Sequence, residues 1–331
     1  MKHRSGMKSL ATTGLLLLAA ILMLAASAWA GGGQSYPNGA ESFMVGAAPP
    51  PGFYFKNYMY YYHAGDLKDD DGDNIDAFDD VTVWAEVMRF IWISKKEILG
   101  GNYGQHVFLP ILDVSLDFKS GVPAGPKHKD NYDDTDVPYI IYSPFILAHH
   151  FLQGKLHTVL SLPDIYIPTG DDKGNMAGVG HNFWTFEPVF AITYMPVPSW
   201  EFSLKFMYDF NTKQDDSPTV YGFNVDRTPG DEFHFDYSVS YGFSKSFRLG
   251  LSGYCYWQTT DDDYDIDNDV PPPVKELLKT DEGNHSRVYA VGPGLWYNYK
   301  NMFFTLRTQF EFDAKNKTEG QNVWFNMVYC F

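Results

Sequence analysis

FSLKFMYDF, residues 202–210, alternates large apolar side chains with mostly polar ones along its whole length. Successive side chains of a β-strand point to opposite faces of the sheet, so a period of two predicts one apolar and one largely polar face. The stretches FHFDYSVSY at 233–241 and LRTQFEFD at 306–313 repeat the pattern. These three segments predict long, half-buried strands of a common design.

The same alternation, followed along the chain, predicts about twelve strands of the length that a membrane barrel needs. Their expected bounds are 53–62, 78–95, 102–118, 136–151, 155–167, 179–195, 200–212, 230–243, 247–260, 285–299, 302–313 and 321–331. Long polar connections, such as 63–77 and 314–320, alternate with short turns. Outer-membrane barrels place long loops outside the cell and short turns in the periplasm.

The first thirty residues have the pattern of a secretory signal. Lys2, Arg4 and Lys8 precede an apolar run at 15–26, and Ala-Trp-Ala at 28–30 forms a small-residue cleavage site. The run is short for a retained membrane helix of about 20 residues, so we expect export and cleavage. Cleavage changes the formal net charge from −16 to −19, which argues against nucleic acid as a partner.

Composition narrows the fold class further. Aromatic residues make up 17% of the chain, and the mature part has no run of about 18 apolar residues that could form a membrane helix. A soluble sandwich or propeller would have shorter strands, and a propeller would show a fixed repeat. We therefore predict an all-β fold, an antiparallel transmembrane β-barrel of about twelve strands at 53–331, in the cell outer membrane.

The final strand, VWFNMVYCF, carries apolar residues at every second position from Val323 to Phe331. It resembles the C-terminal signature by which outer-membrane barrels are recognised for assembly. We accordingly expect Phe331 to act as the signal for the barrel-assembly machinery. The last strand should close against the first one, near Phe53.

Several motifs outside the strands carry a family resemblance. They are SYPNGAESFMVGAAPPPG at 35–52, LSLPDIYIPTG at 160–170, NFWTFEP at 182–188, TPGDEFHFDY at 228–237 and VGPGLWY at 291–297. Together with the last strand, they resemble the outer-membrane channel family associated with the MetA pathway of phenol degradation. The resemblance implies a barrel that takes up small hydrophobic or aromatic compounds by passive or facilitated passage.

The segment 31–52 precedes the first predicted strand and is rich in Pro and Gly without any period. The chain is also similar in design to long-chain fatty-acid transporters, whose N-terminal segment plugs the barrel. Two interpretations remain open, a plug folded into the lumen or a flexible periplasmic leader. The plug candidates are Tyr36, Pro37, Pro49, Pro50 and Pro51.

If the apolar set of each strand faces lipid, the opposite set lines the lumen. The lumen-lining candidates are Lys56, Tyr58, Asp113, His157, Glu187, Lys205, Asp209, His234, Asp236, Arg248, Arg307 and Glu311. Aromatic residues on the same face are Tyr54, Tyr60, Tyr254, Tyr256 and Trp324. The charged groups either pair with one another to fill a small barrel or form a polar path that selects solutes.

Acidic runs at 69–73 and 261–269 fall in predicted external loops. An EF-hand register on the first run would place Leu67 and Phe78 at its first and last ligand positions, so calcium-binding geometry is not expected. Solvated loops, bridged by cations to lipopolysaccharide, fit the pattern better.

Neighbouring His149 and His150 point to opposite faces of a strand, so the pair cannot bind one metal ion together. We predict no metal site and no cofactor.

Two alternatives to a channel remain at this point. A lipid-hydrolysing barrel would need a serine and a histidine in contact, but His234 and Ser238 lie about 13 Å apart along one strand. There is also no GxSxG motif. We therefore expect no catalytic residues. The other alternative is a non-conducting barrel that adheres to surfaces or strengthens the envelope.

Overall fold

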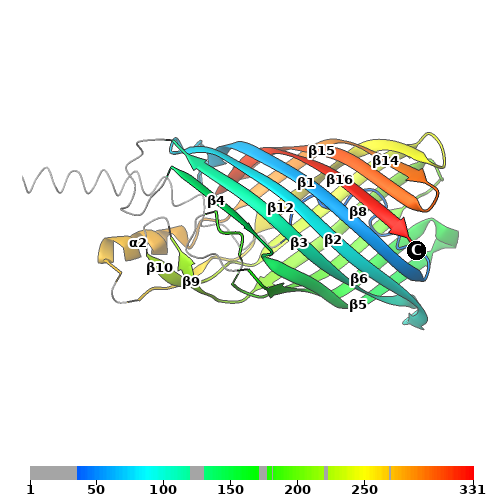
Figure 1. Cartoon of the computed structure of the whole chain (residues 1–331), viewed down its shortest axis with the longest axis horizontal. Helices are drawn as coiled ribbons and strands as arrows, with labels where there is room; N and C mark the ends of the chain where they lie inside the picture. Colours follow the sequence, from blue (N-terminus) through cyan, green and yellow to red (C-terminus); the bar gives the residue numbers. More distant parts are fainter. Residues whose placement is uncertain (1–35, 120–129, 171–176, 181, 220–222, 268–269) are drawn as a thin grey trace, which may run out of the picture.

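The chain forms a closed antiparallel β-barrel in a computed structural model that describes all residues except 1–35, 120–129, 171–176, 181, 220–222 and 268–269 (Figure 1). The predicted signal segment at 1–30 lies outside the described residues. The wall consists of β1 (Gly52–Lys68), β2 (Phe78–Ile98), β3 (Gly101–Phe118), β4 (Asn131–Asp136), β5 (Tyr139–Phe151), β6 (Leu156–Pro168), β7 (Thr185–Tyr194), β8 (Trp200–Asn211), β11 (Glu232–Gly242), β12 (Phe247–Gln258), β14 (Arg287–Tyr299), β15 (Met302–Lys315) and β16 (Lys317–Cys330).

The barrel has twelve strand positions because β4 and β5 share one. Both pair with β3, β5 at its short-turn end and β4 at its loop end. The predicted strand 136–151 is therefore longer and is interrupted at 137–138, where Pro138 cannot donate a ladder hydrogen bond. The prediction of an antiparallel barrel of about twelve strands is confirmed.

The barrel closes through an antiparallel ladder between β1 and β16, from Tyr54 opposite Cys330 to Lys68 opposite Lys317. The amide of Phe331 also donates to the carbonyl of Phe53, at 3.3 Å. Both strands extend further toward the loops than predicted. The expected long loop at 314–320 is instead a tight turn around Asn316, which has a positive φ of 47°. A closed sheet leaves no unpaired edge in lipid.

The two faces of the wall differ as the alternation predicts. Along β7 and β8, buried residues alternate with partly or fully exposed ones, and the exposed set is mostly aromatic. Large side chains exposed on the outer surface include Phe186, Phe190, Phe202, Phe210, Leu251, Leu306, Phe310 and Phe325. Polar side chains fill the inside, where Glu187, Asp209 and Asp236 are almost fully buried. This apolar exterior is the one that a lipid bilayer requires.

Most of the remaining elements lie at the loop end of the barrel (Figure 1). They are β9 (Gln214–Pro218), β10 (Asn224–Thr228), β13 (Asp263–Asp265) and α2 (Pro272–Asp281), whereas the short 3-10 helix η1 (Leu152–Gly154) forms a turn at the other end. The side chain of Leu278 on α2 packs against Val225 and Tyr264. No helix in the described part of the chain is long and apolar enough to cross a membrane.

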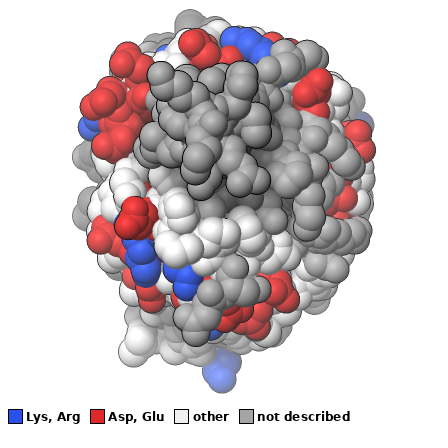
Figure 2. Space-filling view, turned by 90° about the vertical axis from the view of Figure 1, so that its left-hand side faces the viewer, with Lys and Arg blue, Asp and Glu red and all other residues white. Residues whose placement is uncertain are grey.

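Figure 2 looks onto the loop end and shows Asp and Glu side chains spread around its rim, with fewer Lys and Arg. The run at 69–73 is a compact turn, in which the Asp69 carboxylate accepts hydrogen bonds from the amides of Asp71 and Asp73. Leu67 and Phe78, which flank this turn, are buried apolar residues. Neither can supply a side-chain ligand to a cation.

Asp113 does not line the lumen, so that prediction is wrong. The apolar residues Val114 and Leu116 on β3 face inward, where they pack with Phe78 beneath the loops. Asp113 consequently points outward, opposite the exposed Trp84, and accepts a hydrogen bond from Thr135 on β4. The rule that the apolar set faces lipid fails here because the loop end of the barrel has a small apolar core of its own.

Phe206→Arg tests the lipid-facing assignment. Phe206 lies midway along β8 and packs against Phe235 on the outer face. A guanidinium there should lower the free energy of unfolding of the barrel in vesicles by about 2–4 kcal/mol. Phe210→Arg, near the loop end of the same face, is the control and should cost about 0–1 kcal/mol. Equal costs in urea unfolding experiments would contradict the depth that we assign to these residues.

Candidate functional site

Residues 36–48 of the N-terminal segment, 36–50, lie inside the barrel against its inner wall. Asp236, on the inner face of β11, accepts hydrogen bonds from the Tyr36 hydroxyl at 2.8 Å, the Gly39 amide at 2.8 Å and the Glu41 amide at 3.1 Å. All these groups are buried. Hydrogen bonds to a charged acceptor are stronger than those between neutral groups, so Asp236 anchors the segment.

Glu41 forms the second anchor, through cationic side chains on the adjacent strands β1 and β2. Its carboxylate lies 2.5 Å from the Lys56 ammonium and 2.8 Å from the Arg89 guanidinium. It also accepts a hydrogen bond from the Tyr58 hydroxyl, at 2.6 Å. Two wall cations thus depend on one carboxylate of the N-terminal segment for charge compensation. Removal of one member of such a buried set is costly because the others keep an uncompensated charge.

Gly39 allows the closest approach between segment and wall. It has a φ of +78°, and a Cβ at this position would lie 2.3 Å from Oε1 of Gln309. The Arg307 guanidinium donates to the Gly39 carbonyl at 2.7 Å and also to that of Ala40. Glycine is therefore required for both the backbone conformation and the space available.

The segment continues toward the short-turn end of the barrel. The Met44 amide donates to Glu201 at 2.9 Å, and the Gly46 amide donates to the Thr193 hydroxyl at 2.9 Å. Of the predicted plug residues, Tyr36 and Pro37 lie within the lumen and line its pocket. The three prolines at 49–51 do not: the first is half-buried and the other two are exposed, and they lead the chain into β1. The chain bends at Pro50 and Pro51 as it leaves the lumen.

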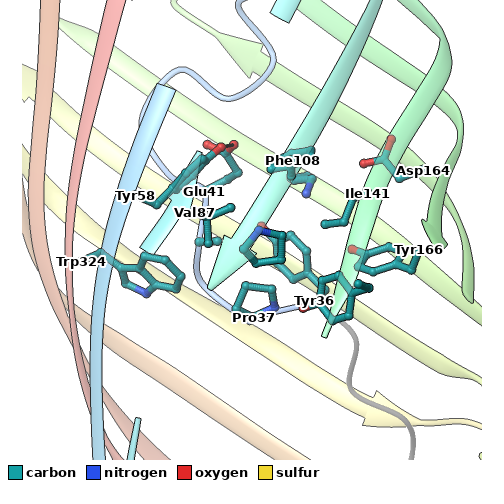
Figure 3. Close-up of a pocket in the computed structure, with 14 residues that line it drawn as sticks. Tyr36, Pro37, Glu41, Tyr58, Val87, Phe108, Ile141, Asp164, Tyr166 and Trp324 are labelled. Atoms are coloured by element: carbon teal, nitrogen blue, oxygen red, sulfur yellow. Dashed lines mark hydrogen bonds between the residues drawn. The ribbon is translucent and has the colours of Figure 1, made fainter. Parts of the chain in front are cut away.

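A pocket that is open on one side lies between this segment and the wall. Its lining residues are Tyr36, Pro37, Ala40, Glu41, Tyr58, Val87, Phe108, Pro110, Tyr139, Ile141, Asp164, Tyr166, Lys205 and Trp324. In Figure 3, Tyr36 and Pro37 lie in the middle, with Trp324 on one side and Tyr166 on the other. The lining is mostly aromatic and aliphatic, and the charged groups are few.

The aromatic rings of the pocket are packed against one another. Tyr58 meets Trp324 edge-to-face with ring centroids 6.4 Å apart, and Tyr139 meets Tyr166 in the same way at 5.1 Å. The Lys205 ammonium lies 4.0 Å from the centroid of the Tyr36 ring. Edge-to-face pairs and cation–π contacts restrict ring rotation, so the pocket walls are well defined.

The structure places the other predicted lumen residues on the inner face, at different heights. Glu311 accepts hydrogen bonds from the hydroxyls of Tyr62 and Tyr254. Arg248, near a short turn, donates to Ser240. His157 lies at the short-turn end, where its Nδ1 is 2.6 Å from Nδ1 of His150. These groups form local pairs outside the pocket lining.

A chain of polar side chains that the period-two pattern does not reveal lies beside the pocket. Arg89 contacts Nδ1 of His106 at 2.8 Å, and Nε2 of His106 lies 2.7 Å from the Ser143 hydroxyl. Ser143 in turn donates to Asp164. Ser161 and Asp164 both face inward although they are three positions apart, because β6 is irregular between them. A strict period of two could not place Asp164 on the inner face. Arg89, a charged residue within an otherwise apolar strand, was a usable signal for this polar chain.

Comparison with known proteins agrees with this architecture. The chain matches the COG4313 outer membrane channel from Pseudomonas putida F1 with a TM-score of 0.71 and 12% identity, over 87% of this chain and 98% of the other. It also matches the TodX deltaS2S3 mutant monoaromatic hydrocarbon channel with 9% identity, over 88% and 92% of the two chains, but its TM-score of 0.44 is too low to support an inference. A search of curated sequences gives no match.

These findings define a β-barrel of the outer-membrane type. Residues 64–327 match the family described as "Putative MetA-pathway of phenol degradation". Since the match covers most of the chain, the protein belongs to this family, as the sequence motifs had indicated. The likeness to the Pseudomonas channel, at its low identity, is one of fold.

Glu41→Gln tests the anchoring of the N-terminal segment. Lys56 and Arg89 would lose their shared counter-charge, at a cost of about 3–5 kcal/mol if neither relaxes. We expect residues 36–50 to become cleavable by protease while the barrel stays folded, as followed by mass spectrometry. Glu319→Gln, which disrupts the ion pair with Lys68 in the wall, is the control. Equal protection of the segment in both variants would contradict the anchoring role.

Proposed function

We propose that this protein is an outer-membrane channel for passive or facilitated uptake of small hydrophobic or aromatic compounds. The observation that carries the proposal is the aromatic pocket between the N-terminal segment and the wall. Its mostly aromatic and aliphatic lining has the chemistry that binds a single aromatic ring. Lys205, Glu41 and Asp164 supply the few polar groups that orient a ligand with a hydroxyl substituent.

The segment 36–50 acts in this proposal as a plug that narrows the lumen. A barrel of this size encloses a space between the filled eight-stranded barrels and the open sixteen-stranded porins. The segment is held by wall hydrogen bonds through Asp236 and Glu201, so an uncontrolled aqueous path is blocked. Release of the part that Asp236 holds would enlarge the passage. The contacts of Met44 and Gly46, nearer the short-turn end, would keep the segment attached.

Biogenesis is part of the proposal. The signal at 1–30 would direct export and be cleaved, and Phe331 would be read by the barrel-assembly machinery. Exposure of 82% of the Phe331 side chain, at the end of the closing strand, is compatible with such recognition. The acidic loops would face lipopolysaccharide, with divalent cations between them and its phosphates.

A non-conducting barrel that strengthens the envelope is the second candidate. The extensive anchoring of the N-terminal segment favours it, because a permanently closed lumen would also need such contacts. The two candidates differ in one measurable property, which is solute flux through the purified barrel.

Flux should be measured for phenol and for a sugar of similar size, in liposomes that contain the full protein or a variant lacking 36–51. We expect phenol uptake above the lipid background with the full protein. The deletion should admit both solutes, because the lumen is no longer narrowed. Absence of flux for both solutes in both forms, with barrels that migrate as folded on gels, would overturn the proposal.

Trp324→Leu tests the pocket itself. Loss of one aromatic contact of about 0.5–1.5 kcal/mol corresponds to an about two- to tenfold change in affinity, so phenol uptake at low concentration should fall by that factor. Trp92→Leu, on the outer face, is the matched control and should leave uptake unchanged. Similar rates in both variants would exclude the pocket from the path.

A further inference from the structure

Three metal-ligating side chains converge on the inner wall outside the pocket lining. They are Glu187 on β7, Asp209 on β8 and His234 on β11. The register between β7 and β8, with Phe186 opposite Phe210, places the two carboxylates opposite each other. One ligand atom of each residue lies within 4.8 Å of the others, and all three side chains are almost fully buried.

The polar atoms of this cluster are largely unsatisfied. Both carboxylate oxygens of Asp209, both ring nitrogens of His234 and Oε1 of Glu187 have no hydrogen-bond partner among the described residues. Only Oε2 of Glu187 has one, from the Tyr166 hydroxyl at 2.9 Å. A buried carboxylate without a partner is costly, so two of them facing one imidazole require compensation. A divalent cation would balance both negative charges.

The spacing suits a first-row transition-metal ion. Nε2 of His234 lies 3.5 Å from Oδ2 of Asp209 and 3.8 Å from Oε2 of Glu187. Ligands at about 2.0–2.2 Å from a tetrahedral zinc ion are separated by roughly 3.3–3.6 Å. Small side-chain rotations would therefore complete the three ligand bonds.

We propose that Glu187, Asp209 and His234 bind one divalent transition-metal ion, of which zinc is the best fit. An imidazole ligand disfavours calcium and magnesium, which prefer oxygen, and there is no thiolate in the set to select a softer ion. Tyr166 would hold Glu187 in place from outside the coordination sphere, as such partners commonly do. A fourth position remains for water.

The site would brace the wall directly behind the pocket. The ring of Tyr36 lies 5.2 Å from that of His234, and Tyr166 both lines the pocket and donates to Glu187. One ion would tie three consecutive wall strands together at this level. The metal thereby supports the position of two aromatic residues without contacting a solute.

The test uses the full, untagged protein with His150→Gln and His157→Gln, because that exposed pair could itself bind zinc. After loading with zinc and dialysis, elemental analysis should find one equivalent per barrel. Copper loading should give an electron paramagnetic resonance spectrum with coupling to a single imidazole nitrogen. Less than about a tenth of an equivalent, or a signal without nitrogen coupling, would overturn the proposal and favour a proton shared by the two carboxyl groups.

Asp209→Asn and His234→Gln, in the same background, should each lower zinc affinity at least tenfold. The control is Glu311→Gln, at a buried carboxylate that is already satisfied by two tyrosine hydroxyls, and it should leave affinity unchanged. Folding is checked by gel mobility for each variant. Unchanged affinity in the two ligand variants would also exclude the site.

Discussion

The requirement that every backbone polar group be paired within lipid governs this structure. A sheet satisfies it only by closing, and the ladder between β1 and β16 closes this one. Closure with twelve strand positions leaves an interior too wide for wall side chains alone to fill and too narrow for a wide aqueous pore. The N-terminal segment occupies part of that interior, and its backbone amides and carbonyls find partners on the wall.

Ion pairs and hydrogen bonds hold the N-terminal segment in the interior, in addition to the apolar packing of Tyr36 and Ala40. Asp236 accepts three hydrogen bonds from the segment, and Glu41 returns a carboxylate to cations of β1 and β2. The wall therefore supplies a carboxylate for the donors of the segment, and the segment supplies a carboxylate for the cations of the wall. Such interlocking is directional, so it fixes one position of the segment, whereas an apolar plug could slide. The pocket lies between Tyr36 on this segment and Trp324 on the wall.

The sequence was sufficient for the barrel but not for the site. Period-two alternation, loop order and terminal motifs predicted the fold. Inner residues such as Lys205 and Asp236 were found by parity alone, that is, by assigning every second residue of a strand to the same face. Parity failed at Asp113, where the loop end has its own apolar core. It could not reveal which inner residues meet across strands, since Glu187, Asp209 and His234 are brought together by register. Register depends on pairing between segments distant in sequence.

In the proposed channel, the acidic rim of Figure 2 would act on a solute before any pocket residue does. A mouth lined mainly by carboxylates depletes anions and enriches cations within about 8 Å at physiological ionic strength. Uncharged molecules are unaffected. The loops of the proposed channel would therefore sort solutes by ionisation state. A weak acid would enter mainly in its protonated form, and the barrier to its anion would fall as salt concentration rises.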